Sequence, residues 1–144
     1  MNFIDRALEE KKKDDDFLQA MANIYSESEV REQLDQYPSF IRDVIHIIDY
    51  DTEVQMEGIE SVCYGTLSDK CEDILTALHN CGLESEYNCL QAAVKLSKQI
   101  DQEELGEDLI GEEWEKIDSS IALNNDYDEF WDKVREYINR NLDY

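Results

Sequence analysis

Hydrophobic residues recur three and four positions apart along most of the chain, which is the spacing of a helix that buries one face. Strict alternation of polar and apolar residues, the pattern of a half-buried strand, is nearly absent. The apolar stripes run over Phe17–Ile24, Val30–Leu34, Ile41–Val54, Cys71–Leu78, Tyr87–Ser97, Ile110–Ile121 and Tyr127–Leu142. We therefore predict an all-α fold, a compact single-domain multi-helix bundle of about seven helices.

The third stripe is the most apolar segment of the chain and is predicted to form the central helix. Pro38 fits the first turn of this helix, where its missing N–H group has no intrahelical partner to lose. Gly58 is expected to mark a bend or break near its end. The inward residues of the stripe are Ile41, Val44, Ile45, Ile48 and Val54.

Residues that can begin or end a helix flank the other stripes. Gly82 follows the fourth stripe in the position of a left-handed helix cap. In the last helix the dipole favours Asp128 and Glu129 in the first turn and Arg140 near the end. The predicted N-terminal caps or openings are Ser26 or Ser28, Ser68 or Asp69, Ser85, and Asn125 or Asp126.

The length of 144 residues is that of one ordinary domain, and no repeat or low-complexity linker divides it. We predict one acidic helical domain over residues 1–144. The segment Glu9–Asp16 is a run of charges, so residues 1–15 are expected to form a loosely packed N-terminal arm.

Net charge narrows the classes of partner. Thirty-six Asp and Glu residues face thirteen Lys and Arg residues, for a net charge of −23. Solubility of a small domain needs only roughly 2–8 units of net charge. Phosphate binding depends on Lys and Arg, so direct nucleic-acid binding and binding to an anionic membrane are not expected. A basic protein surface is the expected partner.

The four cysteines are predicted to be reduced thiols. The N-terminal residues resemble no signal peptide and no segment is long and apolar enough to span a membrane, so we predict a cytoplasmic protein. Cys71 and Cys81 lie on apolar helix faces and are assigned to the core, with a metal or redox role as the alternative. The cysteine spacings match no metal-binding pattern.

No known catalytic motif is present, and we predict no enzyme activity, catalytic residue, cofactor or metal. His46 lies between apolar residues and is read as a satisfied, partly buried imidazole. The alternative is a small hydrolase or metal-dependent enzyme, which would need His46 or His79 in a pocket with carboxylates.

Acidic residues are densest between Asp101 and Glu136, where fourteen acids accompany three bases. Carboxylates three or four residues apart on a helix lie about 5–6 Å apart. DNA phosphates rise about 3.4 Å per nucleotide of one strand, so such a helix can approximate the charge spacing of DNA. The candidate partner-binding residues are Asp101, Glu103, Glu104, Glu107, Asp108, Glu112, Glu113, Glu115, Asp118, Asp126, Asp128, Glu129, Asp132 and Glu136. The alternative is a solvated acidic face with no partner.

Three segments resemble a known family in order and spacing over roughly residues 35 to 142. They are Asp51–Ile59, with its Glu-Val pair, Ile74–Leu83, which ends a helix at a glycine, and Asp128–Trp131, which joins acids to aromatics. Together they resemble the bacterial DNA-mimic protein (DMP-type) family of acidic all-helical proteins. The resemblance implies an all-α fold and a homodimer that occupies a DNA-binding protein.

The resulting hypothesis is an acidic protein-binding module that covers the DNA-binding surface of a basic partner such as a transcriptional regulator. One alternative is an immunity or antitoxin-type inhibitor of a basic toxin nuclease. Another is a structural adaptor that makes contact through Trp114 or Trp131. The last is an acidic domain without any mimic function.

Overall fold

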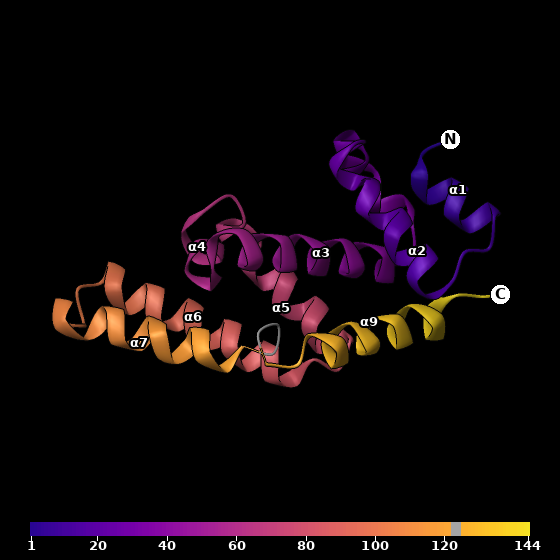
Figure 1. Cartoon of the computed structure of the whole chain (residues 1–144). Helices are drawn as coiled ribbons and strands as arrows, with labels where there is room; N and C mark the ends of the chain where they lie inside the picture. The colour runs from indigo at the N-terminus through magenta and orange to yellow at the C-terminus, as the bar shows by residue number, and fades with distance from the viewer. Residues whose placement is uncertain (122–124) are drawn as a thin grey trace.

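The computed structural model describes residues 1–121 and 125–144, and it shows an all-α single domain (Figure 1). The α-helices before the long central one are α1 (Phe3–Glu9) and α2 (Asp14–Met21). The 3-10 helices η1 (Ala22–Tyr25) and η2 (Ser28–Gln36) follow them. The rest of the chain forms α3 (Ser39–Glu57), α4 (Ile59–Tyr64), the short 3-10 helix η3 (Ser68–Lys70), α5 (Cys71–Asn80), α6 (Glu84–Asp101), α7 (Glu107–Ser120) and α9 (Tyr127–Asn141).

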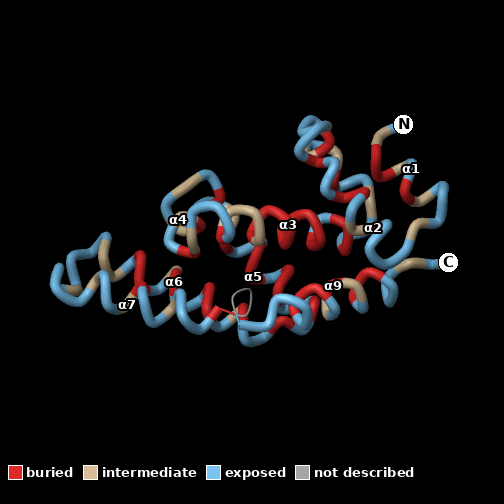
Figure 2. Tube along the Cα trace, in the orientation of Figure 1, coloured by how far each residue is buried: buried red, intermediate tan, exposed pale blue. Residues whose placement is uncertain are grey.

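The central helix predicted from the sequence is α3, and all five of its predicted inward residues are buried. It contacts α2, α4, α5 and α9, so core residues follow almost its whole length (Figure 2). Pro38 directly precedes the helix as its N-cap rather than standing in its first turn. Gly58 ends the helix with a φ of +88°, and α4 begins at the next residue. The predicted break at Gly58 is confirmed.

The expectation of a loosely packed arm over residues 1–15 is wrong. Phe3 and Ile4 are buried in the core, and they belong to a capped helix, α1. The Asn2 side chain accepts hydrogen bonds from the backbone N–H groups of Ile4 and Asp5, at 2.9 and 3.0 Å. The Asp5 carboxylate accepts one from the backbone N–H of Asn2 in return, which completes a capping box. Only the charged run around Lys11 is a solvated turn between helices, as the sequence suggested.

Two predicted caps differ from the structure. The segment carrying Val30 and Leu34 is a 3-10 helix that begins at Ser28 without a side-chain cap. Similarly, the predicted capping residues before α5 form η3, and no side chain caps α5. Gly82 does adopt the left-handed conformation, with a φ of +75°, and Asp126 does cap α9. Asn125 lies outside that cap.

The buried face of α6 is rotated from the prediction. Leu90 and Ser97 are buried as expected, whereas Tyr87 and Val94 are only partly covered. The reason is that α6 packs against α4 and α5 as well as α7, which buries a wider face than one stripe. The further buried residues of α6 are Glu86, Cys89, Ala93 and Leu96.

Candidate acidic interaction surface

The fourteen candidate acids lie on three consecutive parts of the structure: the end of α6 with its connection to α7, α7 itself, and the N-cap and first three turns of α9. Thirteen of them are exposed and Glu113 is partly covered. In the view of Figure 1, α7 and α9 follow one another along the lower edge of the molecule. At 1.5 Å per residue each of these helices is about 20 Å long. The acids are therefore spread along an extended surface rather than gathered in one cleft.

The α7 helix has a clear division between its two sides. Its buried side is marked by Trp114, which is 5% exposed, and Figure 2 shows most of the remaining helix at the surface. Five acids of this helix are exposed, and helical spacing places three of them, Asp108, Glu112 and Glu115, on the side opposite Trp114. We call the five exposed residues the α7 acidic face: Glu107, Asp108, Glu112, Glu115 and Asp118.

Little positive charge compensates the α7 acidic face. Lys116 is the only base in α7, and it pairs with Glu113 at 3.1 Å, on the other flank of the helix. The Glu113 hydrogen bond and charge raise the pKa of Lys116, with a smaller contribution from Glu112. Within the described residues, Glu107, Asp108 and Glu115 form no ion pair with a base. Their negative charges therefore project into solvent.

The acids of α9 also point away from the core, but bases accompany them. Lys133 pairs with Glu129 at 3.7 Å, four residues earlier on the helix. Arg135 pairs with Asp132 at 2.7 Å and with Asp15 of α2 at 2.5 Å. The start of α9 is therefore less negative than the α7 acidic face, although the sequence grouped the two together.

Two of the candidate acids, Glu103 and Asp126, also take part in the end or the start of a helix. Glu103 ends α6 in the left-handed conformation, with a φ of 57°, and the backbone N–H of Glu104 donates to the Gln99 carbonyl at 2.8 Å. Asp126 accepts a hydrogen bond from the backbone N–H of Glu129 at 3.3 Å as the cap of α9. The Asp126 carboxylate also raises the pKa of Glu129. Glu103 and Asp126 therefore have a role in helix termination or capping in addition to their negative charge.

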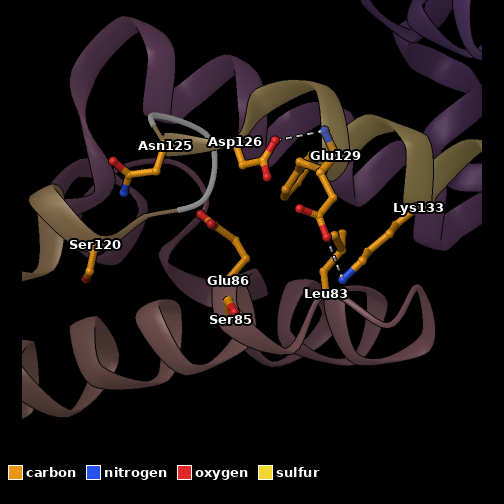
Figure 3. Close-up of a pocket in the computed structure, with 9 residues that line it drawn as sticks. Leu83, Ser85, Glu86, Ser120, Asn125, Asp126, Glu129 and Lys133 are labelled. Atoms are coloured by element: carbon orange, nitrogen blue, oxygen red, sulfur yellow. Dashed lines mark hydrogen bonds and ion pairs between the residues drawn. The ribbon is translucent and has the colours of Figure 1, made fainter.

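A hollow of about 270 Å³ separates the end of α7 from the start of α9 (Figure 3). Glu86 of α6 lines it and is fully buried, and its carboxylate accepts a hydrogen bond from the Tyr50 hydroxyl. Asp126, Glu129 and Lys133 of the acidic region also line it. Burial, followed by the charge of Glu86, raises the pKa of Tyr50 well above its usual value.

Sequence reasoning missed three buried carboxylates: Asp43, Asp49 and Glu86. Arg31 forms a two-pronged ion pair with Asp49, at 2.6 and 2.8 Å. Tyr25 donates a third hydrogen bond to Asp49 at 2.8 Å. The burial of Asp43 and Asp49 could have been predicted from the sequence, because both lie within the most apolar stretch of α3. Apolar neighbours there can bury a charged side chain when it has a hydrogen-bonding partner.

The two histidines have different environments. His46 is 7% exposed, and its Nδ1 atom has no hydrogen-bond partner among the described residues, so the predicted satisfied imidazole is wrong at that atom. Burial lowers the pKa of His46. His79 is exposed and lies 2.8 Å from the Glu84 carboxylate. Residues 1–121 and 125–144 contain no group of three or more His, Cys, Asp or Glu side chains arranged to hold a metal ion.

A comparison with protein-family models matches residues 35–141 to the model described as DMP19-like protein. The match covers most of the chain and includes α3, the α6–α7 pair and α9. The chain belongs to the DMP19-like protein family. The resemblance seen in the sequence is thereby confirmed, and α1, α2 and most of η2 precede the matched region of this DMP19-like protein. Neither curated proteins nor solved structures gave a match. In the described part of the chain, no helix has the length and apolar character needed to cross a membrane.

Proposed function

We propose that this DMP19-like protein is a DNA mimic that binds a basic DNA-binding protein through the α7 acidic face. The observation that carries the proposal is the run of solvent-directed acids at Asp108, Glu112, Glu115 and Asp118, spaced four, three and three residues apart. Such spacing keeps neighbouring carboxylates about 5–6 Å apart on one side of a helix. The acids of the α6–α7 connection and of α9 extend the negative surface at either end.

Family membership supports the same proposal, since the matched region contains every candidate acid. A partner that binds DNA through Lys and Arg would exchange its counterions for these carboxylates, as it does for phosphates. The complex is therefore expected to weaken steeply as salt is added. We also propose that the protein works as a homodimer, which sedimentation of the purified chain would test.

The experiment uses the tagged full chain to capture proteins from a lysate, elutes them with salt, and asks whether duplex DNA releases the same protein. A five-site variant neutralises the α7 acidic face with Glu→Gln and Asp→Asn substitutions. The matched control makes five Glu→Gln substitutions at exposed positions elsewhere: Glu29, Glu32, Glu57, Glu60 and Glu72.

Both variants lose five negative charges, so only the place of the charge differs. The proposal expects the α7 variant to lose the partner and the control to keep it. Equal loss by both variants, or a complex that DNA does not compete for, would contradict DNA mimicry at this face. A captured partner that proves to be a nuclease would favour the immunity-type alternative.

A further inference from the structure

Helix α6 presents one regular stripe of side chains to solvent. The residues of the stripe are all exposed, and they stand four, three, four and three positions apart, so they share one side of the helix. The opposite side of α6 is buried, because the helix packs against α4, α5 and α7. We call the exposed residues the α6 stripe: Glu84, Asn88, Gln91, Lys95 and Lys98.

The α6 stripe has little of the negative charge that dominates the chain. Residues 87–100 contain no Asp or Glu, and they form the longest acid-free run of the sequence. Lys95 and Lys98 form no ion pair within the described residues. Glu84 is the only acid of the stripe, and its carboxylate lies 2.8 Å from the His79 ring. The stripe therefore sets two bases against one acid.

Net charge restricts where two copies of this chain can approach each other. Each copy has a net charge of −23, so two acidic faces brought together repel. Like charges placed opposite one another at an interface are strongly unfavourable, and the acid-free run of α6 avoids this. A basic partner does not suit the stripe, because the two lysines repel it. The occupant that fits is a second copy of the chain.

The α6 stripe is also complementary to itself. Glu84 stands seven residues before Gln91, and Lys98 stands seven residues after it. When two α6 helices run antiparallel about a two-fold axis at Gln91, each Glu84 lies opposite Lys98 of the second copy. A rise of 1.5 Å per residue puts both pairs about 10 Å from the axis. Asn88 and Lys95, three residues before and four residues after Gln91, lie opposite each other in the same way.

We propose that the α6 stripe is the surface through which two copies of this chain form an antiparallel two-fold dimer. The inference rests on the homodimer of the proposed function and names its interface. Two-fold symmetry repeats every contact, so the dimer contains two Glu84–Lys98 ion pairs. The stripe includes no residue of the α7 acidic face, so each copy keeps that face for a basic partner.

The test measures the dissociation constant of the dimer by sedimentation of the purified full chain at roughly 0.15 M salt. Lys98→Glu puts two acids together at each pair and should raise the dissociation constant by about tenfold or more. Glu84→Lys puts two bases together and should also weaken the dimer, although it lowers the net negative charge of the chain. The double variant Glu84→Lys with Lys98→Glu restores opposite charges and should recover the wild-type dissociation constant.

Lys13→Glu is the matched control for Lys98→Glu. It makes the same change of charge at an exposed lysine before α2, and this lysine also forms no ion pair within the described residues. The control should change the dissociation constant by less than about twofold. Equal weakening by Lys13→Glu, or a double variant no tighter than either single variant, would overturn the α6 interface and leave the homodimer standing.

The wild-type chain tests the homodimer by itself. A wild-type chain that sediments only as a monomer would overturn the homodimer and the α6 interface together. The proposed binding of a basic partner by the α7 acidic face is tested separately by the capture experiment.

Discussion

His46 is a residue whose environment opposes its charged form. It lies in α3, and its Nδ1 atom is buried without a hydrogen-bond partner among the described residues. Burial lowers its pKa, although the charges of Asp73, Asp49 and Asp43 act in the opposite direction. Because the unfolded chain takes up a proton here more readily than the native chain, His46 links stability to pH.

We predict that His46→Leu removes part of the acid sensitivity of the fold. Native His46 has the lower pKa, so its contribution is constant above about pH 6.5 and stability falls as pH drops below that value. The loss stops once pH reaches the lowered native pKa, and it amounts to about 1.4 kcal/mol for each unit between the two pKa values. Urea unfolding between pH 7.5 and 5 measures it.

A His46→Leu variant whose stability falls with acid as steeply as the wild type would contradict the role of His46.

Helix ends show which single residues can be predicted from sequence. Lys11, Gly82 and Glu103 all end helices in the left-handed conformation, and each has the paired backbone hydrogen bonds of the same terminal motif. Only Gly82 was expected, because glycine adopts this conformation at little steric cost. A lysine or a glutamate does not predict the left-handed conformation, because it is sterically unfavourable for residues with a Cβ atom. At Lys11 and Glu103 the backbone hydrogen bonds of the helix end outweigh that preference.

At the scale of elements, buried side-chain hydrogen bonds join helices that are far apart in the sequence. Asp43 of α3 is 8% exposed and accepts hydrogen bonds from Asn80 of α5, at 3.0 Å, and from Tyr137 of α9, at 2.6 Å. Burial and the neighbouring Asp43 raise the pKa of Tyr137, which keeps its hydroxyl group a donor. The central helix is thus connected to two neighbours through one carboxylate.

Tyr137→Phe should lower the free energy of unfolding by about 1.5–3 kcal/mol, because a hydrogen bond to a buried charged group is lost. Tyr127→Phe makes the same chemical change on the same helix, at an exposed tyrosine that donates to Asp51 at 3.2 Å. Its cost should stay within about 0.5 kcal/mol. Urea unfolding of both variants compares them, and equal costs would contradict a special role for Asp43.

The helices themselves were largely predictable, because a helix that buries one face leaves a 3.6-residue period in its sequence. That period identified α3 and α9, but the five inward residues that it predicted for α3 are fewer than half of the eleven buried there. It did not identify α1 or α4, whose seven and six residues are too few to show a period. The period also misplaced the buried face of α6, because packing against α4, α5 and α7 buries residues outside a single stripe.

At the scale of the whole molecule, the net charge of −23 acts against the compact state. Like charges three or four residues apart on a helix destabilise it by about 0.2–0.5 kcal/mol per pair. The α7 acidic face contains several such pairs. Its acids are therefore difficult to explain as a source of stability, which agrees with the proposed role in binding.

Neutralising the α7 acidic face should raise the thermal midpoint at low salt and should do so much less at 1 M salt. The reason is that the screening length shrinks from about 30 Å at 0.01 M to about 3 Å at 1 M. Calorimetry at the two salt concentrations measures this, with the five-site control variant alongside. A midpoint that falls at low salt would show that these acids stabilise the fold.

Counting charges predicted which part of the chain is acidic. It could not predict which of those acids form ion pairs with nearby bases. On the sequence alone, Asp132 and Glu112 were equally good candidates for an uncompensated negative charge. In the structure Asp132 lies 2.7 Å from Arg135, while Lys116, four residues after Glu112 on α7, forms its ion pair with Glu113 instead. Arg135 forms ion pairs with both Asp132 and Asp15. The second pair joins α9 to α2, and the spacing of residues within one helix cannot predict a contact between two helices.

That contact between the two ends of the chain has a consequence for synthesis. Asp14 and Asp15 of α2 bond to Asn139 and Arg135 of α9, and Phe17 beside them is fully buried. On the ribosome, α2 emerges more than a hundred residues before α9, its partner helix. Helix α2 therefore waits until α9 has been translated, and a product truncated before α9 would expose apolar surface for chaperones and proteases to recognise.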